Sequence, residues 1–318
     1  MPFTKVSNTV KDSNQPIWQT GVSYIVTDLI EYAPSNDLYL CISDHTSGTF
    51  LTDVASGYWE KIRKASYPGY TTATNYIITD YDTYDHIFVN TSSGDVPITL
   101  PLKANNRRRV ITIMKVNGTS NKVIISPNAS DANTLSNDGL SAMWLPKVGD
   151  SVTFVENSIS GYWEIIYERI TSQLILNTYA GYGATDTCIV RFTNSNVNIG
   201  NMFSENHSTG YSSNTKGLEI TINRSGRYAF SFSMPGQASD AYAGLSINSS
   251  QLTTSIESIT PATRLAWAWN IAYTVSSSQE HVAWTGFLSK NDIVRTHAKG
   301  STIPVIAADA HITVSYLG

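Results

Sequence analysis

The sequence predicts an all-β protein. No stretch of the 318 residues shows the sustained apolar spacing of an amphipathic helix, while alternating apolar and polar stretches bounded by Gly, Asn, Asp and Ser occur throughout. Charged residues make up 14% of the chain, against roughly 25% in an average soluble protein. Ser, Thr and Asn take their place, which suits β-structure, close packing of identical chains or contact with sugars.

The first part of the chain is expected to be small and aromatic. Residues 1–16 are polar and end in Asn14-Gln15-Pro16, which is typical of an extended arm. Residues 17–63 follow as one compact module of short strands. Its many Trp, Tyr and Phe residues are expected to fill a core that is small at this length.

Two larger modules follow. Residues 75–168 contain clear strands and turns such as Asn117-Gly118, and predict a central β-sandwich or prism-like stalk module. Residues 169–187 are expected to be a Gly- and Tyr-rich connection. Residues 188–318 then show eight or nine short strands, the pattern of a sandwich or barrel.

Two strands of the last module carry specific expectations. In 227–234 the large residues alternate with Ala and Ser, so Tyr228, Phe230, Phe232 and Met234 are expected to face the core. In LAWAWNIAY (265–273) the odd positions are large, and Trp267 and Trp269 are expected to face the core. The small even positions would then face another sheet or a second chain.

Composition excludes several classes of function. The net charge of −4 and pI near 5.8 argue against nucleic acid binding, which needs clustered Lys and Arg. No window reaches the about 18 apolar residues of a membrane span, so no membrane insertion is expected. The N-terminus lacks the apolar core of a signal peptide, which favours synthesis and retention in a cytoplasm. Cys41 and Cys188 are interpreted as buried free thiols.

Three segments resemble parts of bacteriophage tail fibre proteins. DHTSGTF (44–50) followed by Tyr58-Trp59 resembles a small module of such fibres that is itself similar to chitinase-type carbohydrate-binding domains. ITLPLKANNRRRVITIMKVNGTSNKVIISPN, closed by SVTFVENSISGYWEII, resembles a second fibre domain. GRYAFSF (226–232), Gly286-Phe287-Leu288 and the ending ITVSYLG resemble the jelly-roll head of C1q and tumour necrosis factor type.

The resemblance implies a homotrimeric tail fibre or receptor-binding protein of the virion, made in the host cytoplasm. Residues 1–63 would attach to a tail or baseplate protein, and the head at 188–318 would bind a host surface glycan or outer-membrane protein. The alternatives are a structural baseplate or tail component without receptor contact, a secreted C1q-like lectin, and a capsule-degrading glycosidase. The missing signal peptide argues against the lectin.

The sequence predicts no catalytic, metal or cofactor site. Asp80, Asp82 and Asp85 are interpreted as solvated turn carboxylates rather than a glycosidase pair, and no repeating coil ladder of the kind found in tailspike depolymerases is visible. The six His residues are scattered. His297 and His311 lie in two expected neighbouring strands, where they could meet around an ion near a three-fold axis.

Receptor contacts are expected on exposed loops of the head, where aromatic rings stack on sugars and amides read hydroxyl groups. The candidates are Phe203, Asn206, His207, Tyr211, Asp240 and Tyr242. SGYWE occurs at both 56–60 and 160–164, each time at the end of a module. We interpret it mainly as a turn that leads into a core strand, and secondarily, at Tyr58 and Trp59, as a sugar-stacking site.

Overall fold

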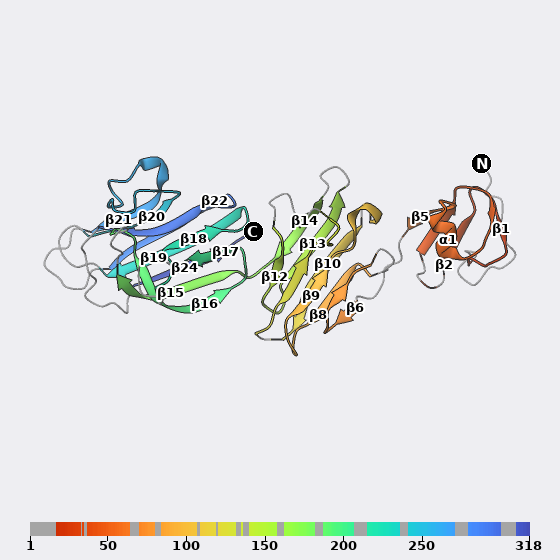
Figure 1. Ribbon diagram of the computed structural model, residues 1–318, viewed down its shortest axis with the longest axis horizontal. Helices are drawn as coiled ribbons and strands as arrows, with labels where there is room; N and C mark the ends of the chain where they lie inside the picture. The colour runs from red at the N-terminus through yellow and green to blue at the C-terminus, as the bar shows by residue number, and fades with distance from the viewer. Residues whose placement is uncertain are drawn as a thin grey trace. The chain divides into compact units, whose positions relative to one another are not determined.

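In the computed structural model, nearly all of the regular secondary structure in the described residues is β-strand, which confirms the predicted fold class (Figure 1). The chain divides into two compact units, Met1–Pro68 and Gly69–Gly318. The residues that the structure describes are 17–32, 34, 37–63, 70–79, 84–106, 109–118, 120–131, 135, 140–157, 162–181, 187–206, 215–235, 241–270, 279–299 and 310–318.

The first unit packs two small sheets and one helix around aromatic rings. Phe50 is central, because its ring lies 5.5, 3.8 and 4.8 Å from the ring centroids of Trp18, Tyr32 and Tyr39. This confirms that large rings fill the small core. The elements are the pair β1 (Ser23–Tyr24) and β4 (His45–Thr46), the sheet β2 (Leu29–Tyr32), β3 (Asp37–Cys41) and β5 (Trp59–Arg63), and α1 (Phe50–Ala55).

The second unit begins with two sheets that share an aliphatic core, as expected for a two-layered module. One sheet has the strand order β14-β13-β10-β8-β6 and the other β12-β11-β9-β7. The strands are β6 (Tyr70–Thr72), β7 (Tyr76–Ile77), β8 (His86–Asn90), β9 (Val96–Thr99), β10 (Val110–Asn117), β11 (Val123–Ser126), β12 (Met143–Leu145), β13 (Ser151–Asn157) and β14 (Tyr162–Arg169), with a 3₁₀ turn at Lys103–Asn105.

The sequence shows no sign of a parallel β-coil, and the expectation that the chain lacks one is wrong. Strands β6, β8 and β10 pair in parallel in one sheet, and β7, β9 and β11 pair in parallel in the other. The chain therefore alternates between the sheets and completes a short three-turn coil, after which β12, β13 and β14 add antiparallel strands. Ile87 pairs with both Tyr70 and Ile113. The two turns of the coil that meet at Ile87 contain different numbers of residues. The sequence therefore has no constant repeat length from which the coil could be recognised.

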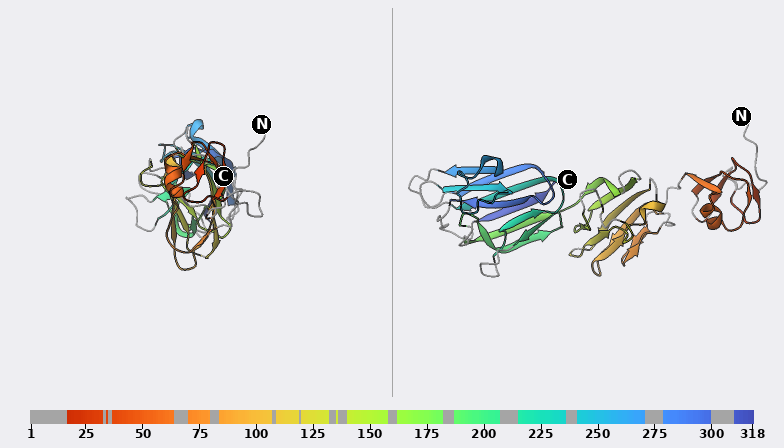
Figure 2. Two further views of the ribbon diagram at one scale, coloured as in Figure 1. Left: turned by 90° about the vertical axis from the view of Figure 1, so that its right-hand side faces the viewer. Right: turned by 45° about the horizontal axis from the view of Figure 1, so that its top comes forward.

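The rest of the second unit is a jelly roll of two facing five-stranded sheets (Figure 2). One sheet has the order β16-β15-β24-β19-β22, and the other has the order β17-β18-β23-β20-β21. The strands are β15 (Gln173–Gly181), β16 (Arg191–Ile199), β17 (Phe203–Asn206), β18 (Glu219–Ile222), β19 (Gly226–Pro235), β20 (Ala241–Ile247), β21 (Arg264–Asn270), β22 (Gln279–Leu288), β23 (Ile293–Ala298) and β24 (His311–Tyr316), with a 3₁₀ turn at Pro261–Thr263.

Module boundaries differ from those expected. Strand β15 lies in the segment expected to be a connection, yet it pairs with β24 and β16 of the jelly roll. The head therefore starts near residue 173 rather than 188. Likewise, β6 pairs with β8 and belongs to the central module, which we expected to begin at residue 75.

The two strand-face expectations have opposite outcomes. Tyr228, Phe230, Phe232 and Met234 are buried, as predicted. The expected face of 265–273 is wrong where the structure describes it: Trp267 is 43% exposed, while Ala266 and Ala268 pack against the core. Phe230 and Trp284 of the facing sheet, whose rings lie 6.0 Å apart, pack in the same core as Ala266 and Ala268. We infer that their bulk favours small side chains on the inner face of β21.

Gly244 of β20 leaves no room for a side chain. A Cβ atom there would lie 2.3 Å from Cγ1 of Ile256 and 2.8 Å from the backbone oxygen of Ala266. Since Ile256 is fully buried, we expect Gly244→Ala to lower the free energy of unfolding by about 1–3 kcal/mol through overpacking. Urea unfolding of the full chain measures this.

The matched control is Gly48→Ala, because a Cβ atom there meets only Asp53 Oδ1 at an ordinary 3.6 Å. It should change stability by no more than about 0.5 kcal/mol. Equal effects of the two substitutions would contradict the steric argument for Gly244.

Candidate functional site

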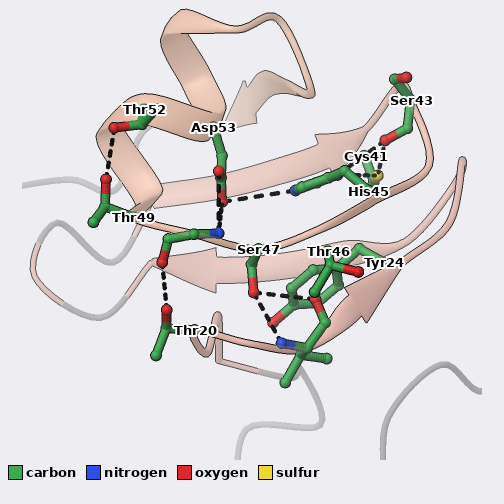
Figure 3. A network of polar contacts seen from close by, with 12 residues as sticks. Thr20, Tyr24, Cys41, Ser43, His45, Thr46, Ser47, Thr49, Thr52 and Asp53 are labelled. Carbon is green, nitrogen blue, oxygen red and sulfur yellow. Dashed lines mark hydrogen bonds and ion pairs between the residues drawn. The ribbon is translucent and has the colours of Figure 1, made fainter.

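The DHTSGTF segment folds into a network of polar contacts in the first unit (Figure 3). The Asp44 carboxylate accepts the backbone N–H of Val26 at 2.6 Å, and the Ser47 hydroxyl donates to Gln19 O at 2.6 Å. Asp53, on α1, accepts the backbone N–H of Gly48 at 3.2 Å. These polar residues therefore hold the loop against the helix and the N-terminal strand, which is a structural role.

Within this network a thiol, an imidazole and a carboxylate lie in line, an order that also occurs in nucleophilic catalysis. Cys41 Sγ lies 3.8 Å from His45 Nδ1, and His45 Nε2 lies 3.7 Å from Asp53 Oδ2. Two observations argue against a nucleophile. His45 Nδ1 is 3.0 Å from Ser43 O, a contact in which only an N–H can donate, so Nδ1 cannot take the thiol proton. Cys41 is fully buried, and burial raises its pKa.

The two cysteines are buried thiols that form no disulfide bond, as the sequence predicts. Because the thiolate is the reactive form, we expect a thiol reagent to modify Cys41 far more slowly in the native chain than in urea. Mass spectrometry of the Cys188→Ser variant measures this for Cys41 alone. Equal rates in the two states would show an accessible, reactive thiol and contradict the structural interpretation.

Both SGYWE tryptophans are core residues. Trp59 is 4% exposed and Trp163 is fully buried, which supports the interpretation of a turn feeding a core strand. The sugar-stacking prediction for Trp59 is therefore wrong, since its ring has no free face. Tyr58 is half-buried and stacks on His45 with ring centroids 4.5 Å apart, so one face of its ring is already covered.

The receptor residues predicted on the head are not brought together as one site. Phe203 is 5% exposed and belongs to the core, so its prediction as a surface contact is wrong. Asn206 is exposed at the end of β17. His207, Tyr211 and Asp240 lie outside the described residues. Tyr242 is half-buried on β20, in a different part of the same sheet.

Tyr242 belongs to an aromatic surface with two cations. Its ring centroid lies 6.0 Å from that of the exposed Trp267 on β21. Arg264 Cζ lies 5.5 Å from the Trp267 centroid, and Lys299 Nζ lies 5.3 Å from the Tyr242 centroid. We call Tyr242, Arg264, Trp267 and Lys299 the β20–β21 patch. Sequence reasoning missed Arg264 and Trp267, the second of them because it was assigned to the core.

His297 and His311 do not lie in neighbouring strands, which was the premise for a meeting around an ion near a three-fold axis. His297 lies on β23 and His311 on β24, which belong to different sheets. His297 is fully buried, and burial lowers its pKa to about 4, with nearby Arg295 adding to the effect. The described residues hold no group of three or more His, Cys, Asp and Glu side chains able to bind a metal ion.

Of the three Asp residues considered as a glycosidase pair, the structure describes only Asp85. Asp85 Oδ1 lies 3.9 Å from Arg109 Nε, so its charge is balanced within the central module. Asp80 and Asp82 lie outside the described residues. Among the helices that the structure describes, none is long and apolar enough to cross a membrane.

Comparison with known proteins gives structural matches alone. No protein-family model and no curated protein matches the sequence. Murine APRIL, in structures determined at pH 5.0 and pH 8.0, covers 46% of this chain with 99% of its own, at 9% and 11% identity and a TM-score of 0.34. A third structure of murine APRIL, at pH 8.5, gives 9% identity and a TM-score of 0.31.

Proposed function

We propose that the chain is a subunit of a homotrimeric bacteriophage tail fibre or receptor-binding protein, located in the virion and without enzymatic activity. The first unit would attach to a tail or baseplate protein, and the jelly roll from residue 173 onward would bind a glycan or protein of the host surface. The resemblance of three segments to tail fibre proteins motivates this proposal.

The outer face of one head sheet is the observation that carries the proposal. Across β24, β19 and β22, register places Thr313, Ser231 and Ala283 side by side, followed by Ser315, Ala229 and Thr285. These side chains are small and partly or fully exposed. A second copy of the chain can approach such a face closely, while Phe287, 65% exposed on β22, offers apolar area at one end.

Light scattering tests the assembly. We expect a mass of three chains of 34.8 kDa, and we expect Ser231→Arg, at the middle of the small-residue face, to give a monomer because a charge is buried there without a partner. Ser204→Arg, at an exposed position on β17, is the matched control and should remain trimeric. A monomeric wild type, or a trimeric Ser231→Arg variant, would contradict this arrangement.

Binding to bacterial cells tests the receptor-binding role of the head, and an assay of polysaccharide cleavage tests the absence of enzymatic activity. Labelled full-length trimer is expected to bind a subset of bacterial strains, with competition by unlabelled trimer and loss of binding on deletion of residues 173–318. Binding that survives the deletion would favour a structural baseplate role for the head. A reducing-end assay on capsular polysaccharide should stay negative, and turnover would establish the glycosidase alternative. That assay matters because the parallel coil removes one argument against a depolymerase.

A further inference from the structure

A β-bulge in β21 gives the β20–β21 patch its composition. Leu245 pairs with Ala266, but the next residue, Ser246, pairs with Arg264, so Leu265 is an extra residue in the ladder. In a regular strand, residues three apart point to opposite faces. The bulge cancels that alternation and brings Arg264 to the same outer face as Trp267, with its guanidinium near the indole.

The charge of Arg264 is not balanced by the described part of the chain. Its Nη2 donates to Ile259 O at 3.2 Å, its Nε is buried without a hydrogen-bond partner, and no carboxylate of the described residues lies within ion-pair distance. A buried or half-buried cation normally has an anionic partner. The Arg264 guanidinium therefore lacks an anionic partner among the described residues, and the carboxylate of a bound ligand would supply one.

The central module offers a useful contrast. Lys122 Nζ lies 3.6 Å from the Trp144 ring centroid, a shorter cation–π contact than the one at Arg264. There, however, Asp95 lies 3.7 Å from the same ammonium group. The two sites have the same ring chemistry, and they differ in whether an acidic residue of the chain balances the cation.

We propose that Trp267, Tyr242 and Arg264 form a binding site for a saccharide that carries a carboxylate group. This rests on the proposed function, because it names the class of surface glycan that the head would bind. The exposed indole offers an apolar surface to the C–H face of a sugar ring. The guanidinium offers paired N–H donors to a carboxylate. Lys299, above the Tyr242 ring, adds positive charge.

The test uses isothermal titration of the full-length protein with acidic oligosaccharides and with the neutral methyl esters of the same compounds. We expect the acids to bind at least about tenfold more tightly than their esters, since a charged hydrogen-bonded pair is lost on esterification. Arg264→Gln should abolish the difference between acid and ester. Trp267→Ala should weaken binding of both by about tenfold, and Trp267→Phe should restore part of the loss.

Tyr167→Ala is the matched control, because Tyr167 is also an exposed ring but lies on β14 of the central module, away from the head. It should leave binding unchanged. Equal affinity for acid and ester, absence of binding to every acid at millimolar concentration, or preference for phosphorylated oligosaccharides would each overturn the proposal. If the Trp267 and Arg264 variants stay trimeric and bind cells as the wild type does, this site is wrong while the proposed function stands.

Discussion

Replacing Glu168 with alanine is expected to lower the free energy of unfolding by about 3–5 kcal/mol, the cost of breaking a buried ion pair from one side. Glu168 lies one residue before the end of β14 in the central module, and both of its carboxylate oxygens contact the head. One accepts a hydrogen bond from Arg224 Nη1, and the other accepts the Tyr316 hydroxyl at 2.5 Å. The Glu168 and Arg224 side chains are only 14% and 9% exposed.

The contacts around Glu168 link the two modules through several groups. The Tyr228 hydroxyl donates to Arg224 O at 2.6 Å and so fixes the turn that carries the arginine. Burial raises the pKa of Tyr316, so its hydroxyl remains a donor across the neutral range. A second contact nearby has Asn201 of the head donating to Ala142 O at 2.8 Å and accepting Trp144 N–H at 3.1 Å.

Urea unfolding and limited trypsin digestion together test the Glu168 prediction. Besides losing stability, Glu168→Ala should be cut faster after Arg169, because the contacts that hold β14 against the head are gone. Tyr316→Phe removes one hydrogen bond and should cost only about 1 kcal/mol. Glu164→Ala is the control on the same strand: Glu164 is exposed, so stability should stay within about 0.5 kcal/mol. Similar losses at 164 and 168 would refute the role of the pair.

Alternation within one strand could be predicted from the sequence, whereas relations between strands could not. The buried face of β19 follows from period two alone, and Tyr228, Phe230 and Phe232 are buried as predicted. In β21 the same reasoning failed because it assumed that the larger residues face inward. The bulge at Leu265 and the bulk of the facing Phe230–Trp284 pair decide that orientation, and neither is visible in residues 265–273.

The candidate site shows the same limit. Tyr242 was predicted as a contact residue from its loop, but its partners Arg264, Trp267 and Lys299 come from other strands or strand ends. The hydrogen bond between Glu168 of the central module and Tyr316 of the head could not be predicted for the same reason, because the two residues are far apart in the sequence. The parallel coil was hidden by turns of unequal length. In each case the missing information is which distant residues become neighbours.

The second large effect concerns pH, and it arises at His297. The imidazole is fully buried on β23, and both ring nitrogens lack a hydrogen bond of ordinary geometry. Burial chiefly, and Arg295 in addition, lower its pKa to about 4 from the ordinary 6.5, although the Thr254 backbone works in the opposite direction. Below pH 6.5 the unfolded chain therefore binds a proton that the native chain does not.

The folded-state pKa lies below the unfolded value, so the contribution of His297 is fully present above pH 6.5 and is lost as the pH falls toward 4. Between pH 7.5 and 4.5 the loss should be about 2.5 kcal/mol, from 1.36 kcal/mol per unit. His297→Leu cannot bind that proton, so its urea-unfolding free energy should fall less over this range by about that amount. His281→Gln, at an exposed position on β22, should keep the wild-type slope. A His297→Leu slope equal to that of the wild type would mean that the imidazole is protonated, and therefore hydrated or paired, in the native chain.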